Sequence, residues 1–162
     1  MRVYNMPTFY KNTLLGLLLM ITTNVHADES SPPFSAVQRL FSAISAFDYM
    51  EMKAVATSDF QLLEVGEVWD MDVLINVLKP AENQFKRRNY FAVIKLVEKD
   101  DIAWVSYWNK AVYESTETKT KTWLESAVMI NTDNEWKLQM LHSTGVDSAS
   151  VPESVDFEEY VN

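Results

Sequence analysis

The sequence predicts an α+β domain in which a short helical half is followed by a long, curved antiparallel sheet. Apolar residues recur at helical spacing up to about residue 78 and alternate with period two beyond Pro80. The alternating runs are about nine to thirteen residues long, which is long for strands and indicates strong curvature or twist. Helices that precede a run of antiparallel strands are expected to cover one face of the sheet.

Three helices are expected before the sheet. The first starts near Ser35, because Ser35 and Gln38 have the spacing of a capping box and an apolar stripe follows them. A second short helix starts at Asp48 and a third at Asp70, each with the aspartate as N-cap. Pro80 ends the third helix, because proline cannot continue the hydrogen-bond ladder.

One strand is expected ahead of the third helix, at 59–68, bent or ended near Gly66. Four long strands follow the third helix, and their expected ranges are 88–98, 102–114, 120–131 and 136–144. The last segment, 146–162, carries five acidic residues and no basic one. It is expected to be mobile or to lie loosely on the surface.

The N-terminus has the three parts of a secretory leader. Arg2 and Lys11 supply positive charge, residues 14–21 form a short apolar run, and residues 25–27 resemble a cleavage site. The expected organisation is a signal peptide at 1–27, a linker at 28–34, one domain at 35–145 and an acidic tail at 146–162. Cleavage near Ala27 would place the protein in the periplasm or outside the cell. The apolar run is too short for a spanning helix, so no membrane anchor is expected in the mature form.

Composition excludes several functions. The formal net charge of −9 repels phosphate backbones, so no nucleic-acid partner is expected, and the basic run 86–88 is interpreted as a solvated strand edge. The chain has no cysteine. After the leader it has two glycines, Gly66 and Gly145, and one histidine, His142. These numbers exclude phosphate-binding glycine loops and zinc sites built on several His or Cys residues. Composition leaves a carboxylate site for Ca²⁺ or Mg²⁺ open, but no segment has the spacing of an EF-hand loop, so we expect no cofactor and no metal.

Several motifs resemble those of the NTF2-like superfamily, specifically its SnoaL-like and DUF4440-type members. The resemblance covers roughly residues 35–145 and rests on several short motifs that occur in the same order along the chain as in that family. These motifs are Asp59-Phe60 at the first strand, Gly66 and Trp69 ahead of the third helix, and Trp136-Lys137-Leu138 with His142-Ser143 on the last strand. It implies a cone in which a curved sheet wraps around the helices and encloses a cavity. Relatives include isomerases, dehydratases and cyclases, but no position here matches the isomerase set of a tyrosine and two aspartates.

Alternation along the last strand suggests interior residues. Trp136, Leu138, Met140 and His142 share its more apolar face, which should therefore face inward. Trp136, Met140 and His142 become candidate ligand contacts, and His142 a candidate acid or base near neutral pH. The alternative is a core histidine satisfied by one buried partner.

The two middle strands carry further candidates. Tyr107 and Asn109 share one face of 102–114, and on a concave face they would give a pocket two polar groups in an aromatic wall. Trp104 and Trp108 would then lie on the convex face and could support a homodimer. Glu125 lies between apolar neighbours. If Glu125 faces the interior, its carboxyl group must be paired or protonated, and it becomes a catalytic candidate. If it faces outward, it is a solvated surface charge.

Three functions stay open at this level. The first is an exported domain that binds a small, partly apolar molecule in the cone. The second is a cofactor-independent enzyme of the isomerase, dehydratase or cyclase type, with His142 and Glu125 or Tyr107 transferring protons. The third is a non-catalytic interaction protein that dimerises through the convex face.

Overall fold

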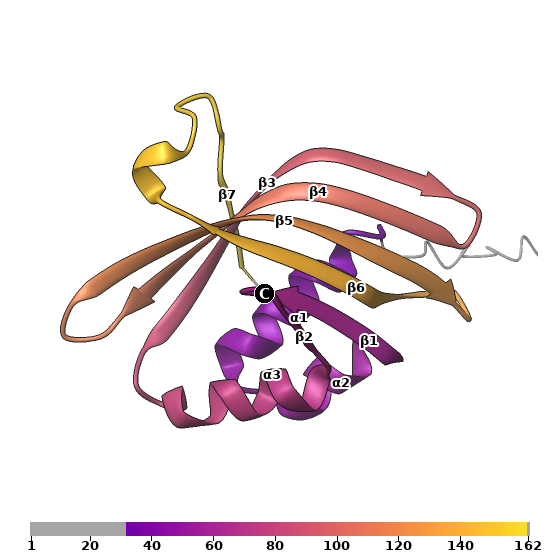
Figure 1. The fold of residues 1–162 in the computed structure, drawn as a ribbon, viewed down its shortest axis with the longest axis horizontal. Coiled ribbons are helices and arrows are strands. Elements are labelled where there is room, and N and C mark those ends of the chain that lie inside the picture. The colour runs from indigo at the N-terminus through magenta and orange to yellow at the C-terminus, as the bar shows by residue number, and fades with distance from the viewer. Residues whose placement is uncertain (1–31, 162) are drawn as a thin grey trace, which may run out of the picture.

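Seven strands form one curved sheet that bends around three α-helices (Figure 1). The computed structural model describes residues 32–161, so the expected leader lies outside the described residues. The helices are α1 (Ser35–Ala46), α2 (Tyr49–Ala54) and α3 (Met71–Leu78), with short 3-10 turns at Lys79–Ala81 and Ser148–Ser150. The strands are β1 (Ala56–Glu64), β2 (Glu67–Trp69), β3 (Lys86–Lys99), β4 (Ile102–Glu114), β5 (Thr118–Thr132), β6 (Glu135–Val146) and β7 (Glu158–Tyr160). Within 32–161, no helix has the length and apolar character needed to cross a membrane.

The aspartate caps are confirmed. The side chain of Asp48 accepts a hydrogen bond from the backbone of Glu51 at 3.0 Å, and Asp70 caps α3 in the same way. The capping box expected at Ser35 is wrong, because the N-cap of α1 is Phe34 and it makes no side-chain cap. Pro32 instead starts the turn, since its carbonyl accepts from the backbone N–H of Ser35 at 2.9 Å.

The strand order is β2-β1-β6-β5-β4-β3-β7. The four long strands pair antiparallel as expected, but β1 joins β6 in parallel, so the sheet is mixed. The strand expected at 59–68 is two strands, because Val65 and Gly66 adopt positive φ angles of 47° and 83° and form a hairpin turn.

Two of the long strands contain bulges. Met129 pairs with Leu138 and Val128 with Met140, which leaves Gln139 of β6 without a partner on β5. The pairing of β3 with β4 likewise skips Ile94. An extra residue bends a strand and reverses which face its later side chains occupy. The bulges therefore contribute to the curvature and decide which side chains reach the interior.

The acidic C-terminal segment is part of the sheet, against the expectation that it is loose. Residues 158–160 pair antiparallel with Asn89–Phe91 of β3. The ring of Tyr160 lies 6.3 Å from that of Phe91, and Ser148 contacts the buried Thr122 through their hydroxyl groups at 3.2 Å. Apolar contact and backbone pairing together outweigh the repulsion among its carboxylates.

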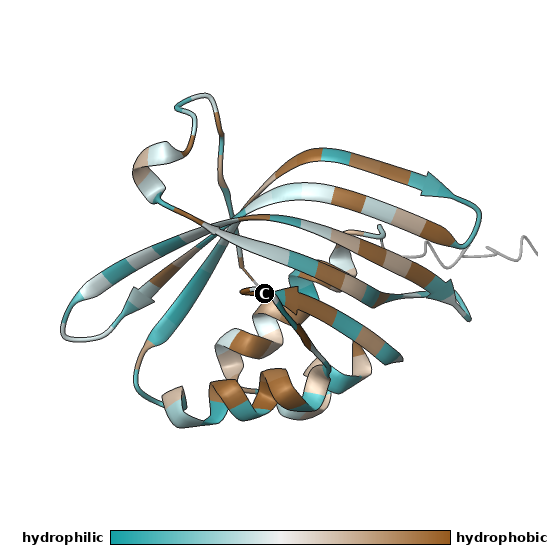
Figure 2. Cartoon of the chain, in the orientation of Figure 1, coloured by the Kyte–Doolittle hydropathy of each residue, from teal (hydrophilic) through white to brown (hydrophobic). Residues whose placement is uncertain are grey.

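The core lies between the helices and the concave face of the sheet. Hydrophobic and hydrophilic residues alternate along the long strands (Figure 2), as a sheet with one solvated face requires. The most deeply buried side chains come from both layers and include Val37, Leu40, Met52, Val105, Met129 and Leu138.

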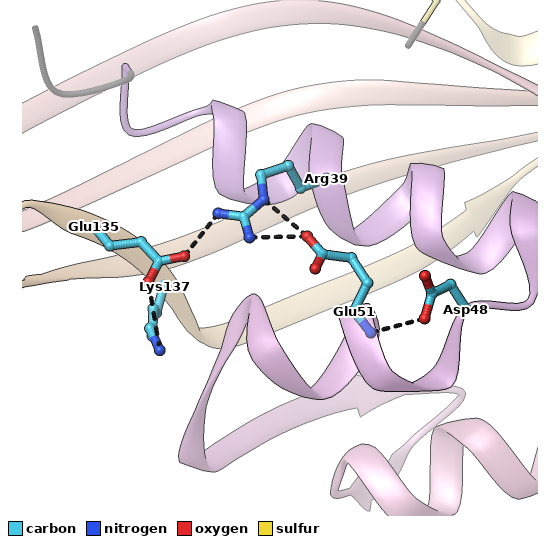
Figure 3. A network of polar contacts seen from close by, with 5 residues as sticks. All are labelled: Arg39, Asp48, Glu51, Glu135 and Lys137. Carbon is cyan, nitrogen blue, oxygen red and sulfur yellow. Dashed lines mark hydrogen bonds and ion pairs between the residues drawn. The ribbon is translucent and has the colours of Figure 1, made fainter.

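A polar network joins the helices to the sheet at one end (Figure 3). Arg39 of α1 donates to Glu51 of α2 at 2.8 and 3.0 Å and to Glu135 at the start of β6 at 2.9 Å. Lys137 lies 3.7 Å from the other carboxylate oxygen of Glu135. These groups are partly exposed, so their effect is mainly to orient α1 and α2 rather than to add much stability.

Candidate functional site

Four polar side chains meet on the concave face of the sheet, and we call them the Glu125 cluster: Tyr107, Asn109, Glu125 and Ser143. In the strand register, Glu125 of β5 stands opposite Tyr107 of β4 on one side and Ser143 of β6 on the other. Asn109 follows Tyr107 by two residues on β4 and is the next side chain on the same inward face. All four are buried, with Tyr107 and Asn109 fully so.

The cluster satisfies the carboxylate but not all of its other polar atoms. Ser143 Oγ donates to Glu125 Oε1 at 2.9 Å, and Asn109 Nδ2 donates to Oε2 at 3.1 Å. The Tyr107 hydroxyl lies near enough to this carboxylate to affect its ionisation as a hydrogen-bonding neighbour would, but the contact falls outside good hydrogen-bond geometry. The Oδ1 atom of Asn109 is also buried without a partner among the described residues. Buried polar atoms of this kind are rare and need an explanation.

Burial controls the ionisation of the cluster. Loss of water raises the pKa of Glu125 to about 7, although Tyr107, Ser143, Asn109 and the charge of Arg87 act in the opposite direction. Burial also raises the pKa of Tyr107 well above its ordinary value, and the neighbouring Glu125 adds to the effect. A carboxyl group whose pKa is about 7 can donate or accept a proton at neutral pH, which is the requirement for acid–base chemistry.

Arg87 lies near the start of β3, on the face of that strand that is turned toward the interior. Its guanidinium carbon lies 5.2 Å from the ring centre of Phe41, 5.5 Å from that of Tyr113 and 5.8 Å from that of Trp123. Its Nε donates to Asn89 Oδ1 at 2.8 Å. Asn89 is in turn fixed to α1, because its Nδ2 donates to the carbonyl of Phe41 at 3.1 Å and to Ser45 Oγ at 2.7 Å.

The interpretation of 86–88 as a solvated edge holds for only two of its residues. Lys86 and Arg88 are exposed, whereas Arg87 is half-buried and turned inward. The signal was present in the strand alternation, since Arg87, Asn89 and Phe91 fall on one face. Burial lowers the pKa of Arg87, but an arginine keeps its charge in proteins.

A pocket of about 520 Å³ opens beside Arg87. Its lining comes from the end of α1, the approach to β3 and the end of β4: Ser45, Ala46, Phe47, Asn83, Phe85, Lys86, Arg87, Arg88 and Glu114. Glu125 does not belong to this lining and lies deeper. Glu125 still lies near enough to Arg87 to interact with it electrostatically. Burial lowers the pKa of Arg87, and the negative charge of Glu125 partly offsets this lowering.

The expectation that His142 faces the interior is wrong. His142 is exposed and lines a hollow of about 400 Å³ between β6 and the β1–β2 hairpin. The reason is the bulge at Gln139, which moves Leu141 and Ser143 inward and turns Met140 and His142 away. Met140 is accordingly half-buried on the outward side. Ser143, which alternation had placed on the opposite face, takes the interior position that His142 was expected to hold.

The structure places the other candidates on the inner surface. Trp136 is buried near the start of β6, and Tyr107 and Asn109 lie together on β4. The question left open for Glu125 is answered, because it is 4% exposed. Trp104 lies on the convex face and is 41% exposed. Among residues 32–161, no three His, Cys, Asp or Glu residues gather closely enough to hold a metal ion.

Comparison with known proteins gives matches in structure alone. No family model and no curated protein matches the sequence. A CamKII hub homology domain from Chlamydomonas reinhardtii superposes with a TM-score of 0.62 at 20% identity, over 70% of this chain and 95% of that one. A ketosteroid isomerase-like protein from Erwinia carotovora atroseptica superposes with a TM-score of 0.58 at 15% identity, over 75% of this chain and 98% of that one.

An NTF2-like protein from Cytophaga hutchinsonii gives a TM-score of 0.55 at 18% identity, over 70% of this chain and 94% of the other. At such identities the likeness describes the fold and not the activity. The three helices packed inside one curved sheet agree with this likeness in fold. The chain therefore has the NTF2-like fold.

Proposed function

We propose that this protein, after export, binds a small, partly apolar molecule on the concave side of its sheet. The observation that supports the proposal is the buried Oδ1 of Asn109, which has no partner among the described residues, beside a Tyr107 hydroxyl that makes only a poorly aligned contact with Glu125. Leaving a buried polar atom such as Asn109 Oδ1 unpaired costs about 1–3 kcal/mol, and a bound molecule with a matching donor would remove that cost.

The surroundings of these atoms suit a partly apolar ligand. The ring of Tyr107 packs against Phe34 at 5.2 Å and Phe91 at 6.0 Å between ring centres. Aromatic walls with a few converging polar groups are the usual composition of small-molecule sites. The motif order that resembles SnoaL-like proteins and the leader-like pattern of residues 1–27 are consistent with this role in an exported protein.

Native mass spectrometry of the protein purified from the periplasm of an expressing bacterium tests the proposal. We expect a discrete extra mass that disappears on denaturation. Asn109→Leu, which removes one polar contact at similar volume, should lose the extra mass. Ser106→Ala, on the opposite face of the same strand, should retain it. A bare chain mass in the unaltered protein, or equal retention in both variants, would contradict binding at the Glu125 cluster.

A second candidate function, homodimerisation, is favoured by the convex face. Ile102, Trp104 and Leu124 are 53%, 41% and 40% exposed there. On this face Trp104 stands opposite Val128 and Trp108 opposite Leu124, with the Ser106–Ser126 pair between them. Exposed apolar side chains gathered on one face of a sheet usually mark an interface. The structural likeness to a CamKII hub homology domain supports an assembly role for this fold.

Light scattering after size-exclusion chromatography tests this assembly. We expect the unaltered protein at dimer mass and the Trp104→Ala, Trp108→Ala double variant at monomer mass. Val68→Ala removes a more exposed apolar residue from β2, far along the strand order, and should leave the dimer unchanged. A monomeric parent protein would end this hypothesis.

A further inference from the structure

We propose that Arg87 binds the carboxylate of a small aromatic or aliphatic acid in the pocket between the end of α1, the approach to β3 and the end of β4. This inference rests on the proposed ligand-binding function and names its ligand class. The relevant group is the outer part of the guanidinium, because the inner Nε is already committed to Asn89. The two terminal nitrogens can contact both oxygens of a carboxylate at once.

Arg87 differs from the other arginines of the described chain in its partners. Arg39 contacts Glu51 and Glu135, and Arg88 contacts Glu114 and Glu159. Within residues 32–161, Arg87 forms no ion pair. A charge withdrawn from water is costly unless a counter-charge or hydrogen-bond acceptors compensate it. A bound anion would supply the missing counter-charge.

The guanidinium is held in place before any ligand arrives. Three ring faces, from Phe41, Tyr113 and Trp123, surround it, and each contact is of the cation–π type. The link from Nε through Asn89 to α1 fixes the rotation of the planar group. A planar donor that is already oriented loses little entropy when it binds an anion, which favours arginine over lysine here.

The pocket beside Arg87 suits a monoanion with an apolar tail. Lys86 and Arg88 stand at its rim, and the acidic member of the lining, Glu114, is engaged by Arg88. Phe47 and Phe85 supply apolar walls, with ring centres 6.0 Å apart. Glu125 lies deeper and carries negative charge when ionised, which disfavours multiply charged anions such as phosphate.

Titration of the ¹⁵N-labelled protein with matched probe pairs tests the inference. The probes are benzoate against benzamide and hexanoate against hexanamide, followed by NMR at the Arg87 Nε–H and the backbone amides. We expect each acid to bind about tenfold more tightly than its amide, as a charge-assisted contact implies, and to shift the Arg87 signal. Arg87→Gln should abolish this preference, and Arg87→Lys should retain only part of it.

Lys99→Gln is the control, because it removes one positive charge at the far end of β3, outside the lining of the pocket, and leaves Arg87 and the Arg88–Glu114 ion pair in place. It should keep the preference for acids within about twofold of the unaltered protein. Loss of the preference in Lys99→Gln, or equal binding of acids and amides, would overturn the inference. Arg87→Lys preserves the charge and carries the test if Arg87→Gln fails to fold. If amides bind near Tyr107 and acids bind no more tightly, the proposed ligand site is supported and the proposed role of Arg87 is contradicted. If no probe binds, both proposals are contradicted.

Discussion

Replacement of Glu125 by glutamine is expected to make the protein more stable above pH 8 and to flatten its stability between pH 5 and 7. The carboxyl group is buried, and loss of water raises its pKa to about 7. Glutamine has nearly the same shape and no charge to desolvate. Rotation of the Asn109 amide would let its unpartnered Oδ1 accept from the new side-chain amide, so the substitution keeps the contacts of the cluster.

The direction follows from proton binding in the two states. The pKa of this carboxyl is 4.5 in the unfolded reference and about 7 in the folded protein. Between these values the unfolded chain has lost the proton while the folded chain keeps it, so the free energy of unfolding falls as pH rises. The fall begins near the lower value and is complete above the higher one. Its full size is on the order of 3 kcal/mol.

Urea unfolding at several pH values between about 4.5 and 8.5 measures this effect. The Glu125→Gln variant should approach the unaltered protein at the acidic end and exceed it by up to about 3 kcal/mol at the basic end. Glu98→Gln, at an exposed position of β3, should leave the pH profile unchanged. Parallel profiles for the unaltered protein and Glu125→Gln would show that the carboxyl ionises normally and that the interior is wetter than its burial implies.

Truncation of Tyr107 to alanine is expected to cost about 3–5 kcal/mol of folding free energy. The side chain is fully buried, and its ring contacts Phe34 and Phe91 on the helical and sheet sides of the core. Alanine would leave a cavity beside Glu125 that these two rings cannot fill without shifting. The measurement is chemical unfolding at a pH near 5, where Glu125 is protonated and adds no separate effect.

Tyr107→Phe is the matched control because it keeps the ring and removes the hydroxyl. Since the contact of this hydroxyl with Glu125 is poorly aligned, phenylalanine should change the unfolding free energy by less than about 1 kcal/mol. A large loss in Tyr107→Phe would mean that the hydroxyl donates a good hydrogen bond to Glu125 in solution, which would leave Asn109 Oδ1 as the unpartnered atom that supports the ligand site. A small loss in Tyr107→Ala would show that the cone interior collapses easily.

Local patterns in the sequence were sufficient for the three helices and the four long antiparallel strands. The aspartate N-caps at Asp48 and Asp70 and the period-two alternation of β4 are encoded by neighbouring residues, so both could be derived without the structure. The resemblance to the NTF2-like superfamily then added the cone, which the solved structures support. The parallel pairing of β1 with β6 could not be derived, because it joins segments about eighty residues apart with no local signal.

The composition of the site was decided by tertiary structure. Alternation alone placed His142 inside, but one unpaired residue, Gln139, reverses the pattern and brings Ser143 to Glu125 instead. A bulge depends on how two strands pair, so a single strand's sequence does not reveal it. Glu125 and Arg87 illustrate the same limit. A charged residue on an alternating strand is interpreted as solvated, and only the packing of neighbouring strands and α1 buries Glu125 and turns the half-buried Arg87 inward. Sequence determined which residues share a face within each unbulged stretch of strand. Pairing with neighbouring strands placed the bulges, and the three-dimensional fold decided which face is buried, because burial is a property of the whole packed layer.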